Sequence, residues 1–212
     1  MIAVSGGNNL RREVQNWRGR RRPIGMKLVS SISLMSNDDV YQTSQSLLKL
    51  AVECVHVIPS FQQLPVDDRD TLLEDSWKDL FILTMAQWSL PVDQDKLLRG
   101  VEAGDDATGR ALRKSLSSIE AVLAKLSHLR VDHTEYACLK ALVLFSPDSV
   151  KKQEIDVLQE QTLLMLSEYS GPRALKLLLI LLGVSKIRVS SVIRIFFRAN
   201  VNSSLLELLS LL

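Results

Sequence analysis

The stretch from Ile58 to Asp93 reads IPSFQQLPVDDRDTLLEDSWKDLFILTMAQWSLPVD, and it decides the fold. One helical pattern ends at Pro59, a short turn follows, and a second helical pattern begins after Pro65. Asp67 and Asp68 favour a helix start there, because carboxylates stabilise the N-terminal end of a helix. The second half of this helix is almost continuously apolar, which predicts that other helices cover it on more than one side.

Helical periodicity also extends upstream of Pro59, from about Asp38 or Asp39. Its apolar residues recur at three- and four-residue spacing, at Leu47, Leu50, Ala51, Cys54, Val55 and Ile58. Leu48 and Val52 widen this stripe, so we expect the first helix to be covered on two sides.

Downstream, the periodicity predicts helices over residues 108–126, 132–145, 148–169, 172–182 and 189–199. Asp132 and Glu135 have the spacing of a capping box at the start of the second of these. No strand pattern competes with the helical ones. The sequence therefore predicts an all-helical fold.

The composition allows one folded domain with a sizeable core, at 212 residues and 46% hydrophobic. The two cysteines, Cys54 and Cys138, cannot build a disulfide framework or a cysteine-rich zinc module. Charged residues interrupt the N-terminus before a secretory signal could form, and no apolar run reaches the roughly 18 to 20 residues of a membrane span. We expect a soluble protein of a reducing compartment.

Charge is distributed unevenly along the chain. Residues 1–37 carry seven bases and one acid (7 − 1 = +6), residues 38–171 carry 13 and 22 (13 − 22 = −9), and residues 172–212 carry six and one (6 − 1 = +5). Residues 1–36 lack sustained periodicity, which predicts a flexible, hinge-like basic arm before a domain at 37–212. The run RGRRRP at 18–23 is either a nuclear-import or nucleic-acid contact or a solvated linker.

Enzymatic chemistry finds no support in the sequence. His56, His128 and His133 are scattered, and no phosphate-binding loop, dinucleotide fingerprint or hydrolase motif is present. Paired acids such as Asp105-Asp106 are more often solvated helix ends than catalytic dyads. We therefore expect neither an enzyme nor a cofactor or metal site.

The residues around the turn resemble the signature of nuclear receptor ligand-binding domains, with Arg69 in place of the usual Gln; the matching positions are Pro59, Phe61, Leu64, Asp68, Arg69, Leu72, Leu73 and Trp77. The segments LRVDHTEYACLKALVLF (129–145) and LKLLLILL (175–182) resemble the tailless and photoreceptor-specific subfamily. This resemblance implies a three-layer antiparallel helical sandwich around a pocket.

Trp77, Phe81, Met85 and Trp88 lie on one face of the second helix, at spacings of four, four and three residues. Their position alone indicates core residues; the resemblance implies that they also line the ligand cavity. Trp88 stands where retinoid-type receptors carry an Arg that receives the ligand carboxylate. The resemblance thus implies an orphan receptor with a small or filled cavity and no obligatory ligand.

The family also binds an amphipathic coregulator helix in a surface groove. The matching positions here are Val52, His56, Val66, Asp70 and Leu73, with Glu207 the acid available on the last helix. His56 replaces the usual Lys, and Asp70 stands at a normally apolar position, which disfavours an LxxLL coactivator. The resemblance to the tailless subfamily then favours an Atrophin-type corepressor over an LxxLL coactivator as partner, although His56 could also be an ordinary surface residue.

The last ten residues, SSLLELLSLL (203–212), predict a short apolar helix capped by Ser203 or Ser204. It would either pack over the pocket or lie in the groove as an autorepressive plug. The residues 176–182, with Val189, Ile193 and Phe196, resemble the helix at which receptors dimerise, although a core position explains them equally well.

Together, the resemblance implies a transcriptional regulator of the nucleus that binds coregulators and forms a homo- or heterodimer. DNA contact would then require a zinc-finger domain, which these 212 residues do not contain. The competing hypothesis is a receptor gated by a lipophilic ligand that recruits coactivators through its C-terminal helix. A third is direct nucleic-acid binding by the basic arm.

Overall fold

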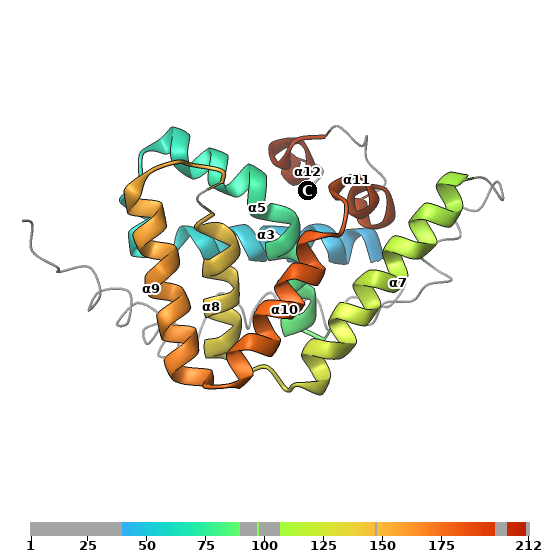
Figure 1. Ribbon diagram of the computed structural model, residues 1–212. Helices are drawn as coiled ribbons and strands as arrows, with labels where there is room; N and C mark the ends of the chain where they lie inside the picture. Colours follow the sequence, from blue (N-terminus) through green and yellow to red (C-terminus); the bar gives the residue numbers. More distant parts are fainter. Residues whose placement is uncertain (1–39, 90–96, 98–106, 147, 198–202, 211–212) are drawn as a thin grey trace, which may run out of the picture.

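The computed structural model describes residues 40–89, 97, 107–146, 148–197 and 203–210 (Figure 1). Within these residues every regular element is a helix, which confirms the predicted all-helical class. None of these helices is long and apolar enough to cross a membrane. The predicted basic arm at 1–36 lies outside the described residues.

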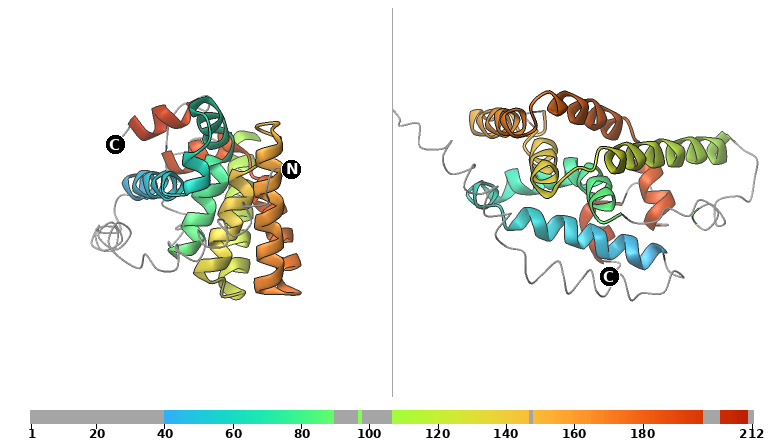
Figure 2. Two further views of the ribbon diagram at one scale, coloured as in Figure 1. Left: turned by 90° about the vertical axis from the view of Figure 1, so that its left-hand side faces the viewer. Right: turned by 90° about the horizontal axis from the view of Figure 1, so that it is seen from below.

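The helices stack in three layers, which the view from below in Figure 2 separates most clearly. The first layer is α3 (Val40–His56), and the middle layer holds α5 (Val66–Gln87) and α8 (His133–Leu144). α5 packs against α3 on one side and against α8 on the other. Leu80, Phe81, Ile82, Leu83 and Thr84 are consequently all buried, as the continuous apolar pattern predicts.

The third layer holds α9 (Gln153–Ser170), α10 (Arg173–Ser185) and α7 (Ala107–His128). α10 contacts both of the others and lies between them in both views (Figures 1 and 2).

The turn between α3 and α5 follows the prediction. Ile58 is extended, as is usual before a proline, and α4 (Pro59–Gln62) forms a single helical turn. Phe61 is fully buried, which fixes the turn on the core.

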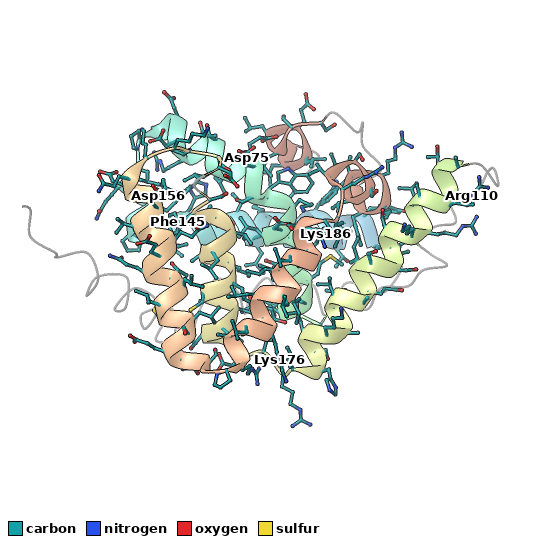
Figure 3. The ribbon with its side chains drawn as sticks, in the orientation of Figure 1. Asp75, Arg110, Phe145, Asp156, Lys176 and Lys186 are labelled. Carbon is teal, nitrogen blue, oxygen red and sulfur yellow. The ribbon has the colours of Figure 1, made fainter. Side chains whose placement is uncertain are left out.

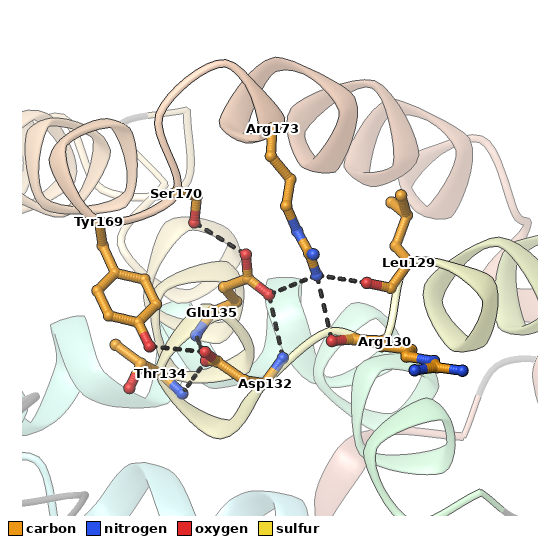
Figure 4. Close-up of polar contacts among 8 residues, drawn as sticks. All are labelled: Leu129, Arg130, Asp132, Thr134, Glu135, Tyr169, Ser170 and Arg173. Carbon is orange, nitrogen blue, oxygen red and sulfur yellow. Dashed lines mark hydrogen bonds and ion pairs between the residues drawn. The ribbon is translucent and has the colours of Figure 1, made fainter.

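The predicted capping box is present at the start of α8. Asp132 Oδ1 accepts the N–H of Glu135 at 2.9 Å, and Glu135 Oε2 accepts the N–H of Asp132 at 3.0 Å. Glu135 also forms an ion pair with Arg173 (2.9 Å) and accepts the hydroxyl of Ser170 (3.0 Å), while Tyr169 donates to Asp132 (Figure 4). This network joins the end of α9 and the start of α10 to α8.

Two elements differ from the prediction. α9 begins at Gln153 rather than near Asp148, because Val150 turns into the core and Lys152 is extended. In place of the single long helix predicted at 189–199, the described residues form the short helix α11 (Val189–Val192), followed by the π-helical turn η1 (Ile193–Phe197). The wider turn leaves Ile195, Phe196 and Phe197 all buried, which a regular helix on a one-sided core does not favour.

Candidate functional site

The five residues predicted for the coregulator groove lie on α3 and in the first half of α5, two helices that pack against each other. Val52 of α3 and Leu73 of α5 are buried, so they would form the apolar floor of such a groove. Val66 has 59% of its surface exposed, and His56 and Asp70 are exposed as well. We refer to these five residues as the α3/α5 surface. It combines an apolar floor with a polar, open edge.

His56 ends α3 at the edge of this surface. Its ring lies edge-on to Phe61, with ring centroids 5.9 Å apart, and its backbone oxygen accepts the amide of Gln62 at 2.6 Å. The imidazole stands where the resemblance expects a lysine.

α12 (Leu205–Ser210) packs on both α3 and α5, beside the first half of α5 in Figure 1. Leu205 and Leu208 face inward and are buried, whereas Leu206 is 79% exposed. The N–H of Leu205 donates to both carboxylate oxygens of Glu74, at 3.0 and 3.1 Å. Glu74 thus holds the N-terminus of α12, a role that the sequence analysis did not assign.

Glu207 takes part in the cap of its own helix. Its N–H donates to Ser204 Oγ at 3.3 Å, and its carboxylate accepts the N–H of Ser204 at 3.2 Å. Ser204 is one of the two predicted caps. Since Val66 and Asp70 remain exposed, α12 borders the α3/α5 surface at its Glu74 end and does not cover all of it.

Two of the predicted cavity-lining residues, Trp77 and Phe81, pack against Phe196 and Phe197; we refer to these four rings as the aromatic cluster. Trp77, Phe81 and Met85 are buried, and Trp88 is half-buried. The ring of Phe81 lies 5.5 Å from that of Phe196 and 5.2 Å from that of Phe197, and the rings of Trp77 and Phe197 are 6.1 Å apart. The rings of η1 therefore pack directly against this face of α5.

Phe196 and Phe197 were not predicted as partners of this face. The adjacent aromatic pair was visible in the sequence, but a regular helix does not favour turning both rings to one side. Ile193 and Phe196 are fully buried, so they belong to the interior and not to an exposed dimerisation surface.

A polar chain that runs from the exposed His133 to the buried Lys140 links the end of α5 to α8. Lys140 donates to Gln87 Oε1 at 2.7 Å, and Gln87 Nε2 lies 3.2 Å from His133 Nδ1. Burial lowers the pKa of Lys140 to about 8. It raises the pKa of the Cys54 thiol and raises that of Cys138 to about 12, so neither thiol is activated as a nucleophile.

Within the described ranges, no group of three or more His, Cys, Asp or Glu side chains is arranged to hold a metal ion.

Comparison with known proteins points to the family that the motifs resemble. The sequence profile described as the ligand-binding domain of nuclear hormone receptor matches residues 27–191. The chain is 33% identical over 193 residues to nuclear receptor subfamily 2 group F member 6 of Homo sapiens, which covers 84% of this chain and 47% of that protein. It is 35% identical over 144 residues to steroid receptor seven-up, isoforms B/C, of Drosophila melanogaster, covering 65% of this chain and 26% of that one. The chain thus spans about half the length of these relatives, or less.

Proposed function

Because this chain belongs to the nuclear hormone receptor family, matching its ligand-binding domain, we propose that it regulates transcription by docking coregulator helices on the α3/α5 surface. The observation that carries the proposal is the apolar floor of Val52 and Leu73, open at Val66 and bordered by α12. Membership of a receptor family also agrees with the expectation that the chain is not an enzyme. The proposed place of action is the nucleus.

We propose an Atrophin-type corepressor as the preferred coregulator. His56 offers an imidazole where a lysine ammonium would hold the C-terminus of an LxxLL coactivator helix more strongly. Asp70 is exposed beside Val66, and a carboxylate there disfavours burial of an apolar anchor. Both features weaken standard coactivator docking.

The aromatic cluster supports regulation without an obligatory ligand. Phe196 and Phe197 pack beside Phe81, on the face of α5 that the resemblance assigns to the ligand cavity. Under the competing hypothesis of ligand gating, a lipid extract would raise the unfolding temperature, because binding to the native state stabilises it by mass action. We expect no such rise.

The finer relationship to the tailless and photoreceptor-specific subfamily, drawn from residues 129–145 and 175–182, stays a prediction. So does the division into an arm at 1–36 and a domain at 37–212. We also propose that any DNA contact depends on a zinc-finger domain outside these 212 residues.

We further propose that two copies associate through α10. Leu175, Leu179 and Leu182 lie along its outer side and are 67, 66 and 57% exposed.

Charge on the neighbouring helices favours one arrangement of the two copies. α9 carries four exposed acids and no base, whereas α7 carries four exposed bases and one acid. A two-fold axis along α10 places α9 of one copy opposite α7 of the other, whereas an axis across α10 would oppose α9 to α9. Charge favours the first arrangement.

The test of coregulator docking is fluorescence anisotropy with two labelled helices, an LxxLL coactivator peptide and an Atrophin-type corepressor peptide. Each is titrated with the full chain and with a chain that ends before Ser203. We expect both protein forms to bind the corepressor peptide more tightly. Coactivator binding that requires Glu207 would replace repression with the ligand-gated alternative.

A further inference from the structure

The first turns of α5 carry a stripe of acids beside the α3/α5 surface. Asp67, Asp70 and Glu74 follow one another at three- and four-residue spacing, so they share one side of the helix. All three are exposed. Asp68, between them in sequence, forms an ion pair with Lys152 of the loop before α9 and belongs to another side.

The bases near this stripe are few. On α3, Lys49 is exposed one turn before Val52, and on α5, Arg69 is half-buried. His56 is the last residue of α3 and lies at the edge of the same surface. Beside the α3/α5 surface, α5 thus exposes three acids and α3 exposes one lysine, so the rim carries net negative charge.

Glu74 shows how one of these carboxylates binds the N-terminus of a helix. Its two oxygens accept the first N–H of α12, where a negative charge complements the helix dipole. Asp70 and Asp67 continue the stripe toward the open part of the surface, where Val66 is 59% exposed.

From this arrangement we propose that the α3/α5 surface selects an amphipathic partner helix flanked by basic side chains, with Asp67 and Asp70 receiving Lys or Arg of the partner. The proposal rests on coregulator docking at the same surface and specifies the chemistry of the partner. Each exposed ion pair contributes roughly two- to fivefold in affinity, so two pairs give roughly tenfold. Acidic flanks are repelled. Salt weakens the preference, because exposed charges are screened.

The experiment uses three labelled Atrophin-type corepressor helices with identical apolar residues and with Lys/Arg, Gln or Glu in the flanks. Fluorescence anisotropy with the full chain, at about 50 mM and 500 mM salt, measures their affinities. We expect the basic helix to bind about tenfold more tightly than the neutral one, the acidic helix to bind most weakly, and the three to converge at high salt.

The double variant Asp67→Asn/Asp70→Asn should bind the basic, neutral and acidic helices with similar affinity, and the neutral helix should bind as it does to the unchanged protein. Glu154→Gln/Asp156→Asn removes two exposed acids from α9 and serves as the matched control; it should leave the order unchanged. A thermal melt of each variant verifies folding.

Equal binding of the three helices, or an order that survives in the Asp67/Asp70 variant, overturns the charge selection and leaves coregulator docking intact. Failure of all three to bind overturns docking itself, and the selection with it. A synthetic peptide of residues 11–27, which holds this chain's own basic run, is added as competitor. Its displacement of the basic helix at micromolar concentration would assign the acid stripe to the arm and contradict an external partner.

Discussion

At the scale of single residues, the fold buries an ammonium group with a neutral partner. Lys140 is almost fully buried and donates to the amide of Gln87, so no carboxylate compensates its charge there. Such a group is predictable from sequence only as an anomaly within an apolar helix. Its partner comes from the end of α5, more than fifty residues away, and tertiary packing alone brings the two together.

Lys140 gives the fold a defined pH dependence. Its folded pKa of about 8 lies below the ordinary value of 10.5, so between these pH values the unfolded chain holds a proton that the folded chain has released. Stability relative to Lys140→Met should therefore rise as pH increases from 8 toward 10.5. Urea denaturation of both proteins at pH 7 and pH 9.5, in a Cys54→Ser background that removes the neighbouring titratable thiol, measures the difference. A constant difference across this range would contradict a buried, titrating lysine.

Glu135 is the residue on which the network of Figure 4 depends. Replacing it with alanine removes the acceptor for Arg173, Ser170 and the N–H of Asp132, and should destabilise the protein by about 2–3 kcal/mol. The value is below that of a fully buried pair, because the Arg173 side chain is 37% exposed. Glu160→Ala, an exposed acid on α9, should change stability by less than about 0.5 kcal/mol in the same chemical denaturation.

At the scale of elements, periodicity locates the helices but not their irregularities. The starts of α5 and α8 agree with prediction because local signals define them, namely Pro65 and the Asp132–Glu135 box. The π turn of η1 has no such signal. It is favoured by rings packing on α5, an interaction that one-dimensional spacing cannot express.

The aromatic cluster should carry much of the stability of the interior. Trp77→Ala removes a buried ring that contacts Phe197, and we expect a loss of about 3–5 kcal/mol. Trp88 is half-buried at the end of α5, so Trp88→Ala should cost clearly less. Urea denaturation compares the two variants. Equal losses of unfolding free energy would show that burial does not determine how much each ring contributes to stability.

The position of α12 depends on its inward leucines. Leu208 is fully buried and Leu206 is 79% exposed, so Leu208→Ala should release the helix whereas Leu206→Ala should not. Loss of a buried leucine costs about 2–5 kcal/mol, enough to raise amide exchange at 205–209 by at least about tenfold. Hydrogen–deuterium exchange of both variants tests this. Unchanged protection in Leu208→Ala would mean that the Glu74 contact alone holds α12.

At the scale of the whole molecule, the exposed leucines of α10 predict association. Leu179→Glu places a charge in the centre of this stripe and should convert a dimer into a monomer, because burying an unpaired carboxylate is unfavourable. Leu206→Glu, at a still more exposed leucine on α12, should leave the dimer intact. Sedimentation velocity across a range of concentrations reports the state. A wild-type chain that stays monomeric at every concentration would refute the α10 surface.

The sequence predicts the family and the domain more readily than it predicts the site. Val52, Asp70 and Leu73 could be assigned by position in a motif, but Glu74 could not, since its partner is the backbone of Leu205, 131 residues later. Glu207 is the acid available by position on the last helix, and its part in the cap of that helix follows from Ser204 three residues earlier.

The arrangement of charge has a physical consequence for orientation. The four exposed acids of α9 and the four exposed bases of α7 lie on opposite sides of α10, and in Figure 3 Asp156 of α9 lies on the left and Arg110 of α7 on the right. Such a separation is a permanent electric dipole, which experiences a torque in the field of a polyanion. Beside any polyanion, the α7 side would turn inward. The α3/α5 surface, which lies beside the acids of α5, would then face away from the polyanion.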